Sequence, residues 1–218
     1  MTPFVPGLNT HHDDVRLVFE QRDSEIGKAA EEKRKAELKG DGTRNQTMAT
    51  CVNALKEWTG KTNATVVFDS TVDEFTNDGL FEKVRGKRNI AVIGFTTDGD
   101  IFGGFYSIAV TKQVEQFFDP NMFAFSFESH GRCATPQRFV PKGYKMTAYV
   151  RFCNDRNEFV MFGVGGHFSL GNEKSDSWCW AMSDGFEGLE RATLTGKNGH
   201  WAQGPYHHCT RLVAVRLG

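Results

Sequence analysis

The sequence lacks any long hydrophobic run. Its longest apolar stretches, such as residues 90–93 and 122–125, are far shorter than the roughly 20 residues that a membrane-spanning helix needs. The first residues also lack the basic and apolar regions of an export signal. These absences argue against membrane insertion and export. We therefore expect an intracellular protein, in the cytoplasm or, as the alternative, in the nucleus.

The sequence also lacks an excess of charge of either sign. Its 26 Lys and Arg residues face 27 Asp and Glu residues, which gives a formal net charge of −1 at pH 7. This balance excludes the uniformly basic surface that is typical of proteins binding nucleic acid or anionic membranes without specificity. A local basic patch is still compatible with it.

Cysteine is scarce and shows no paired spacing. The five cysteines form no CxxC motif and are odd in number, which argues against a disulfide framework. We interpret them as buried thiols: Cys51, Cys133, Cys153, Cys179 and Cys209.

Phenylalanine is the residue that the chain has in excess. Of its 19 phenylalanines, 17 lie between Phe68 and Phe186, and 39% of all residues are hydrophobic. A chain of 218 residues with this composition can bury one sizeable core and carry an appendage. We expect one domain over residues 46–218.

The appendage is a charged arm over residues 1–45. Eight acidic and seven basic side chains lie between His11 and Lys39, and good helix formers without proline predict a helix over residues 14–38. Its apolar positions are too sparse for sustained heptads. A solvated helix or a partly disordered arm is therefore favoured over a partner-binding coiled coil.

The remaining sequence predicts a mainly β protein with few helices. Apolar residues at intervals of three and four predict helices over residues 46–57 and 77–84. Short β-branched and aromatic runs, separated by turn residues, predict the strands. These are residues 64–69, 89–95, 101–109, 123–128, 147–152, 158–162, 178–182 and 212–217.

The order of these elements indicates the fold class. Turn residues at 97–100 and 154–157 predict hairpins, and therefore antiparallel pairing of sequential strands. In residues 123–128, phenylalanine alternates with small or polar residues, which gives the strand one aromatic face. We predict a mainly β (α+β) sandwich of two antiparallel sheets, flanked by short helices, behind an N-terminal charged helical arm.

Several motifs resemble the TLDc domain, the module of the oxidation-resistance proteins. The most specific is the segment 98–105, Asp-Gly-Asp-Ile-Phe-Gly-Gly-Phe, which resembles a turn and strand of that family. Residues 161–170 resemble its glycine-rich segment, although His167 stands where the family usually has an acid. The strands 90–95 and 212–217 fit the same order. The resemblance covers Trp58 to the C-terminus, and residues 183–206 follow it only loosely.

The resemblance implies a β-sandwich, an intracellular role in resistance to oxidative stress and, for some members, regulation of the vacuolar proton pump. No established catalytic set accompanies the family. On this basis we expect no cofactor and no metal, and the candidate binding residues are Asp98, Phe102, Gly103, Gly104, Gly163, Gly165, Gly166 and His167.

The glycines and the histidines invite two sharper interpretations. Glycine within the strand 102–105 indicates a bulge or a close approach of other backbone, and the alternative is a ligand cradle. The segment 163–168 fails the GxGxxG pattern, so a nucleotide site is disfavoured. His207, His208 and Cys209 have zinc-binding chemistry, but their spacing is poor for a closed tetrahedral site.

Two alternative functions depend on particular side chains. Cys133 follows Arg132, and a neighbouring cation favours the reactive thiolate that an antioxidant enzyme needs. The basic run Lys83, Arg85, Lys87 and Arg88 lies at a helix end, where the helix dipole explains it, or contacts nucleic-acid phosphates.

We therefore expect a non-catalytic protein that acts through protein–protein contact in oxidative-stress protection, with subunits of the vacuolar proton pump as candidate partners. The alternatives are a DNA-binding, stress-responsive regulator and a thiol-dependent antioxidant enzyme.

Overall fold

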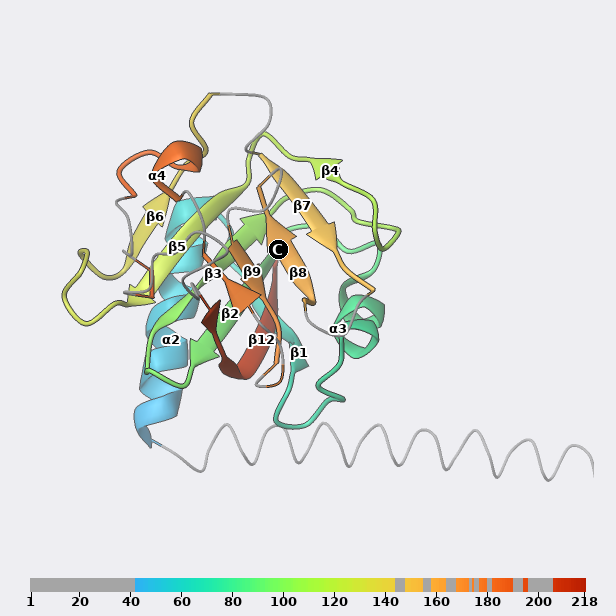
Figure 1. The fold of residues 1–218 in the computed structure, drawn as a ribbon. Helices are drawn as coiled ribbons and strands as arrows, with labels where there is room; N and C mark the ends of the chain where they lie inside the picture. Colours follow the sequence, from blue (N-terminus) through green and yellow to red (C-terminus); the bar gives the residue numbers. More distant parts are fainter. Residues whose placement is uncertain are drawn as a thin grey trace, which may run out of the picture. The chain divides into compact units, whose positions relative to one another are not determined.

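The fold is that of a computed structural model (Figure 1). The chain divides into two compact units, Met1–Thr47 and Met48–Gly218, and the second carries the sheets. The helix predicted over residues 14–38 lies outside the described residues. These are residues 42–143, 148–154, 158–163, 168–172, 174, 177–179, 182–189, 194–195 and 206–218.

The helices are α2 (Gly42–Thr59), α3 (Asn77–Val84) and α4 (Met182–Gly185) in the described part of the chain. The strands there are β1 (Ala64–Asp69), β2 (Ile90–Thr96), β3 (Ile101–Tyr106), β4 (Phe117–Phe118), β5 (Phe123–Glu128), β6 (Gln137–Phe139), β7 (Tyr149–Phe152), β8 (Val160–Phe162), β9 (Phe168–Leu170), β10 (Ser177–Trp178), β11 (Tyr206–His207) and β12 (Cys209–Leu217).

The strands form two main antiparallel sheets. The larger sheet has six strands in the order β1-β12-β2-β3-β5-β6, and the smaller has four in the order β4-β7-β8-β9. Strands β10 and β11 form a separate pair. The predicted mainly β architecture with two antiparallel sheets and few short helices is confirmed.

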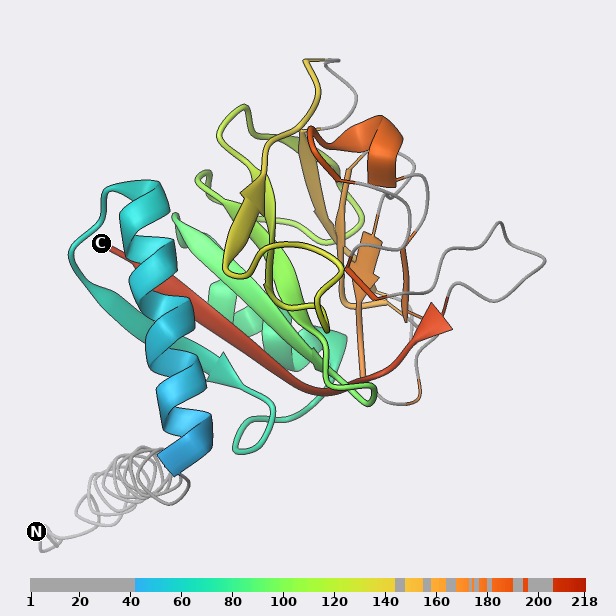
Figure 2. The ribbon, with the colours of Figure 1, turned by 90° about the vertical axis from the view of Figure 1, so that its left-hand side faces the viewer.

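The larger sheet is covered on both faces. One core contains Phe102 and Ala124 of this sheet together with Phe162 and Phe168 of the smaller sheet. The second core joins the other face of the larger sheet to the part of α2 from Met48 onward. Figure 2 shows α2 lying across that face. The layers of the Met48–Gly218 unit are therefore a helix, a six-stranded sheet and a four-stranded sheet.

The aromatic face of β5 lies on the helix side. The alternation predicted for residues 123–128 is confirmed, since Phe123 and Phe125 join one core and Ala124 joins the other. The Trp58 ring of α2 lies 6.0 Å from that of Phe123 and stacks on Phe127 at 5.7 Å between centroids. Much of the phenylalanine excess in this strand therefore fixes α2 to the sheet.

Helix α3 begins and packs as its sequence indicates. Thr76 caps it, because its side-chain oxygen accepts a hydrogen bond from the backbone N–H of Gly79 at 3.1 Å. Its buried stripe is the predicted one: Leu80, Phe81 and Val84.

Two sequence-based expectations were wrong. The strand predicted over residues 178–182 is shorter, because β10 ends at Trp178 and Met182 already begins the helix α4. Sequential pairing also fails for β1, whose neighbour is β12 and not β2. Both predicted hairpins do form antiparallel pairs, β2 with β3 and β7 with β8. The last strand of the chain, β12, thus lies between β1 and β2.

Candidate functional site

The predicted binding residues of β3 are buried on the two faces of the larger sheet: Phe102 and Gly104 face the smaller sheet, and Gly103 faces the helix side with Phe125. Phe102 is fully buried, and its ring centroid lies 5.9 Å from that of Phe168. A Cβ atom at Gly103 would lie 1.9 Å from the carbonyl oxygen of Val92, and one at Gly104 would lie 2.4 Å from the Phe162 ring. These glycines therefore permit a close approach of neighbouring atoms, which is the structural role that glycine in a strand indicates. That they bind a partner stays a prediction.

The other predicted binding residues are separated. Asp98 is exposed in the turn between β2 and β3. Gly163 directly follows β8 with a φ of 94°, and its N–H donates to the carbonyl of Tyr149 at 2.8 Å. Gly165, Gly166 and His167 lie outside the described residues. The fold thus brings β3 and the Phe162–Phe168 ring pair together, and leaves Asp98 in the exposed turn at the ends of β2 and β3.

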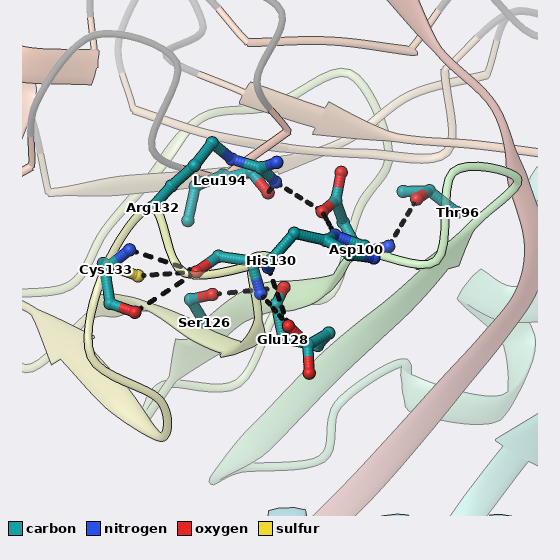
Figure 3. Close-up of polar contacts among 9 residues, drawn as sticks. Thr96, Asp100, Ser126, Glu128, His130, Arg132, Cys133 and Leu194 are labelled. Atoms are coloured by element: carbon teal, nitrogen blue, oxygen red, sulfur yellow. Dashed lines mark hydrogen bonds and ion pairs between the residues drawn. The ribbon is translucent and has the colours of Figure 1, made fainter.

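A buried carboxylate lies two residues after Asp98. The Asp100 side chain is only 2% exposed, and its Oδ1 contacts the Nη2 of Arg132 and lies 2.9 Å from the Nδ1 of His130 (Figure 3). Its backbone N–H donates to the hydroxyl of Thr96 at 3.0 Å. A buried charge needs such partners, because an uncompensated carboxylate in the interior is very unfavourable.

These contacts hold the segment between β5 and β6, which we name the 129–136 loop. Arg132 reaches from it to Asp100 and donates to the carbonyl of Leu194 at 3.0 Å. At the start of the loop, the Glu128 carboxylate accepts the backbone N–H of His130 at 2.7 Å. Most of the loop is exposed, including residues 130–132 and 134–136. The contacts of the buried Asp100 with His130 and Arg132 therefore hold a loop whose other residues are mostly exposed.

Cys133 is half-buried within this loop. Its sulfur lies 3.3 Å from the Ser129 hydroxyl, which also accepts its backbone N–H at 3.2 Å. The neighbouring Arg132 is bound to the Asp100 carboxylate, as Figure 3 shows. The side chain that made Cys133 a redox candidate thus contacts an acid, and the local bonds close a turn.

The buried cysteines are poor sources of thiolate. Burial raises the pKa of Cys51 to about 12 and that of Cys209 to about 12, and it raises the pKa of Cys179 as well. A thiol is reactive through its thiolate form, which these sites disfavour. Thiol chemistry at neutral pH therefore has its best candidate at Cys133.

The basic run after α3 is partly paired with acids. The Lys83 ammonium lies 3.0 Å from the Asp73 carboxylate, and Arg85 lies 3.5 Å from Glu82. Lys87 is half-buried and Arg88 is exposed. Two of the four cations proposed for nucleic-acid contact thus have acidic neighbours, which reduces the positive potential of the run.

The zinc alternative concerns two described histidines near the C-terminus, His207 and His208. His207 is fully buried, with its ring 5.1 Å from that of Phe102. Among the described residues, no group of three His, Cys, Asp or Glu side chains could hold a metal ion.

No helix in the described part of the chain is long and apolar enough to cross a membrane.

The Asp100 cluster is only partly visible in the sequence. An aspartate in a turn is usually a capping residue, and the sequence by itself favours that role for Asp100. Its partners lie about 30 positions later, at separations of 30 and 32 residues. A carboxylate directly before an apolar strand is the signal that the sequence offers, and it does not name its partners.

The comparisons agree with the motif analysis. The TLDc domain model matches residues 43–187, which includes α2 except its first residue and every element from β1 to α4. The expected resemblance began later, at Trp58, and ran further, to the C-terminus; β11 and β12 follow the matched range. A search of curated proteins found no match. Because this match covers more than half of the chain, the chain belongs to the TLDc domain family.

Proposed function

We propose that this protein acts by non-catalytic protein recognition in oxidative-stress protection. Membership of the TLDc family supports the stress role, since the family is that of the oxidation-resistance proteins. A subunit of the vacuolar proton pump is the partner to test first, because the resemblance implies this role for some members.

The observation that carries the proposal is the 129–136 loop on its buried base. Recognition surfaces bind more tightly when they are held in place before the partner arrives, because less conformational entropy is lost on binding. The ion pair between Arg132, a residue of the loop, and the buried Asp100 supplies that constraint. Thr135 and Pro136, at the end of the loop directly before β6, are exposed, so a partner can reach them.

The two alternative functions have weaker support. A thiol enzyme needs a cation beside its thiolate, whereas Arg132 is bound to Asp100. A DNA-binding surface needs unpaired cations, whereas Lys83 and Arg85 have acidic neighbours. Protein recognition requires neither feature.

Affinity capture from oxidant-treated cells tests the proposal. The tagged full chain is compared with Thr135→Glu, which adds a charge to the exposed loop, and with Thr111→Glu, which adds the same charge to another exposed segment. Quantitative mass spectrometry should find partners, pump subunits among them, that the wild-type chain and Thr111→Glu enrich equally. Thr135→Glu should lose most of that enrichment.

Equal enrichment by all three chains would remove the loop from the proposal. A partner list without any stable protein over the untagged control would remove protein recognition itself. If pump subunits alone were missing, the pump assignment would fail and recognition would remain.

A further inference from the structure

A groove of about 620 Å³ opens at the end of helix α2. Its walls come from the end of α2, from the β4–β5 segment, and from β6 with the residues after that strand. It shares no residue with the 129–136 loop. The groove and the loop are therefore separate surfaces, and binding in the groove does not depend on the proposed function of the loop.

The groove is cationic. Lys61, Arg138 and Lys142 line it, and no Asp or Glu is among its lining residues in the described part of the chain. This concentration contrasts with the chain as a whole, where the two signs balance to −1. In a recess with low-dielectric walls, charges of one sign attract a ligand of the opposite sign more strongly than they do on a flat surface.

Arg138 is held in the groove in a way that leaves donors available. Its Nη1 donates to the carbonyl of Trp58 at 2.9 Å, and its guanidinium lies 6.0 Å from the ring centroid of Phe123. This is the one hydrogen bond that the Arg138 side chain makes within the described part of the chain. A guanidinium has five N–H donors in a planar fork that matches a carboxylate, so the others can bind a ligand.

Large apolar side chains border the same groove. Phe118 is 46% exposed and Val140 is 41% exposed, and these are two of the three large apolar side chains that are exposed among the described residues. Trp58, half-buried in the wall, is fixed by stacking on Phe127. Rigid aromatic anchors beside a fixed arginine are the usual composition of a strong contact site in protein interfaces.

We propose that this groove binds an acidic linear segment of a partner protein, with a carboxylate on Arg138 and a large apolar side chain against Trp58 and Phe118. Charge complementarity selects the occupant, because only an anionic partner matches three cations without a lining acid. A recess with few cations suits discrete carboxylates. A lipid surface or a nucleic acid would require a broad, projecting basic face.

Fluorescence anisotropy with two labelled peptides tests this assignment. In one short peptide Glu alternates with Phe and Leu, and in the other Lys replaces each Glu. The wild-type chain should bind the Glu peptide and not the Lys peptide. Arg138→Glu should weaken binding by about tenfold or more, because it reverses the charge at the central contact. Arg88→Glu, the same change at an exposed site outside the groove, should leave Kd within about twofold.

A second matched pair tests the apolar contact. Phe118→Ser should weaken binding of the Glu peptide severalfold, whereas Val114→Ser, at a site equally exposed but outside the groove, should not. Urea unfolding of every variant identifies any that has lost its fold. Lys61→Glu, just after α2 in the same groove, serves as a second charge reversal if Arg138→Glu unfolds.

Three results would overturn the assignment. The first is binding of the Lys peptide as tight as that of the Glu peptide, or no binding of either. The second is a Kd unchanged by the charge reversals in the groove. The third is sedimentation with phosphatidylserine vesicles that Arg138→Glu abolishes and the Glu peptide does not inhibit, which would assign the groove to a lipid headgroup.

Discussion

Arg211 and Asp69 form a buried ion pair between strands β12 and β1. The Nε of Arg211 donates to one carboxylate oxygen at 3.0 Å, and its Nη2 donates to the other at 2.5 Å. The two side chains are only 15% and 3% exposed. The pair thus connects the last strand of the chain, which follows the matched TLDc range, to the first strand of the larger sheet.

Breaking this pair should destabilise the fold. Arg211→Met leaves the Asp69 carboxylate buried without its cation, so we expect a loss of roughly 3–5 kcal/mol in the free energy of unfolding. Arg85→Met is the matched control, because its partner Glu82 is exposed, and it should cost at most about 1 kcal/mol. Urea unfolding followed by tryptophan fluorescence measures both. Equal losses in the two variants would contradict the structural role.

The same pair should make stability fall in acid. Burial by itself raises the pKa of Asp69, but the hydrogen bonds and charge of Arg211, with the hydrogen bonds from Thr71, outweigh it and lower that pKa. A lowered pKa in the folded state stabilises above the unfolded value, about 3.9 for aspartate, and the contribution is lost as pH falls through the folded value.

The unfolding free energies of wild type and Asp69→Asn therefore should converge on acidification. Their difference should be constant above about pH 5 and should shrink below about pH 4. Urea titrations at fixed ionic strength and a series of pH values check this. A difference that grows as the pH falls would show that the pKa shift has the opposite sign.

Alanine substitutions at the two glycines of β3 should differ in whether a smaller side chain at Phe162 restores the lost stability. Gly104→Ala places a Cβ against the Phe162 ring, a side chain that can be shortened, whereas Gly103→Ala meets the Val92 backbone carbonyl. Both should cost roughly 2–4 kcal/mol. Adding Phe162→Leu should recover part of the loss for Gly104→Ala and none of it for Gly103→Ala.

Thermal unfolding of the single and double variants measures that difference. Gly86→Ala is the control for backbone strain alone, because its φ is +68° and a Cβ there has nothing within 4 Å. It should cost only about 1 kcal/mol. Rescue of both β3 variants by Phe162→Leu would refute the assignment of the two contacts.

Thiol reactivity should separate Cys133 from the other cysteines. Cys133 is half-buried, whereas Cys51, Cys153, Cys179 and Cys209 are buried, and burial raises the pKa of three of these four. Iodoacetamide at mildly alkaline pH should therefore alkylate Cys133 first. Peptide mapping by mass spectrometry reads the order. Labelling of Cys51 or Cys179 at the same rate in the folded protein would contradict the burial of these two thiols.

The sequence predicted the elements that local pattern determines. Residues 64–69 and 123–128 are bounded strands because β-branched or aromatic side chains run between turn residues, and helix α3 has a cap and a clear stripe. The strands β4 and β6, with only two and three residues, are too short for any periodicity to appear.

Long-range relationships could not be predicted in this way. The last strand, β12, lies between β1 and β2. The Arg211–Asp69 pair likewise joins two residues that are 142 positions apart in the sequence. In the candidate site, turn residues in the sequence predict the turn that carries Asp98. The contact of Asp100 with Arg132, however, depends on how two separate loops meet. Such contacts follow from tertiary packing, which no local pattern specifies.

The proposed function is the protection of cells from oxidants by recognition of a partner protein. The most direct test measures the survival, under peroxide, of cells that lack their own TLDc-domain protein. The wild-type chain, Cys133→Ser, Thr135→Glu and Thr111→Glu are expressed at equal levels. Recognition through the 129–136 loop predicts that wild type, Cys133→Ser and Thr111→Glu protect equally and that Thr135→Glu does not. Loss of protection in Cys133→Ser, with full protection by Thr135→Glu, would contradict it and favour thiol chemistry.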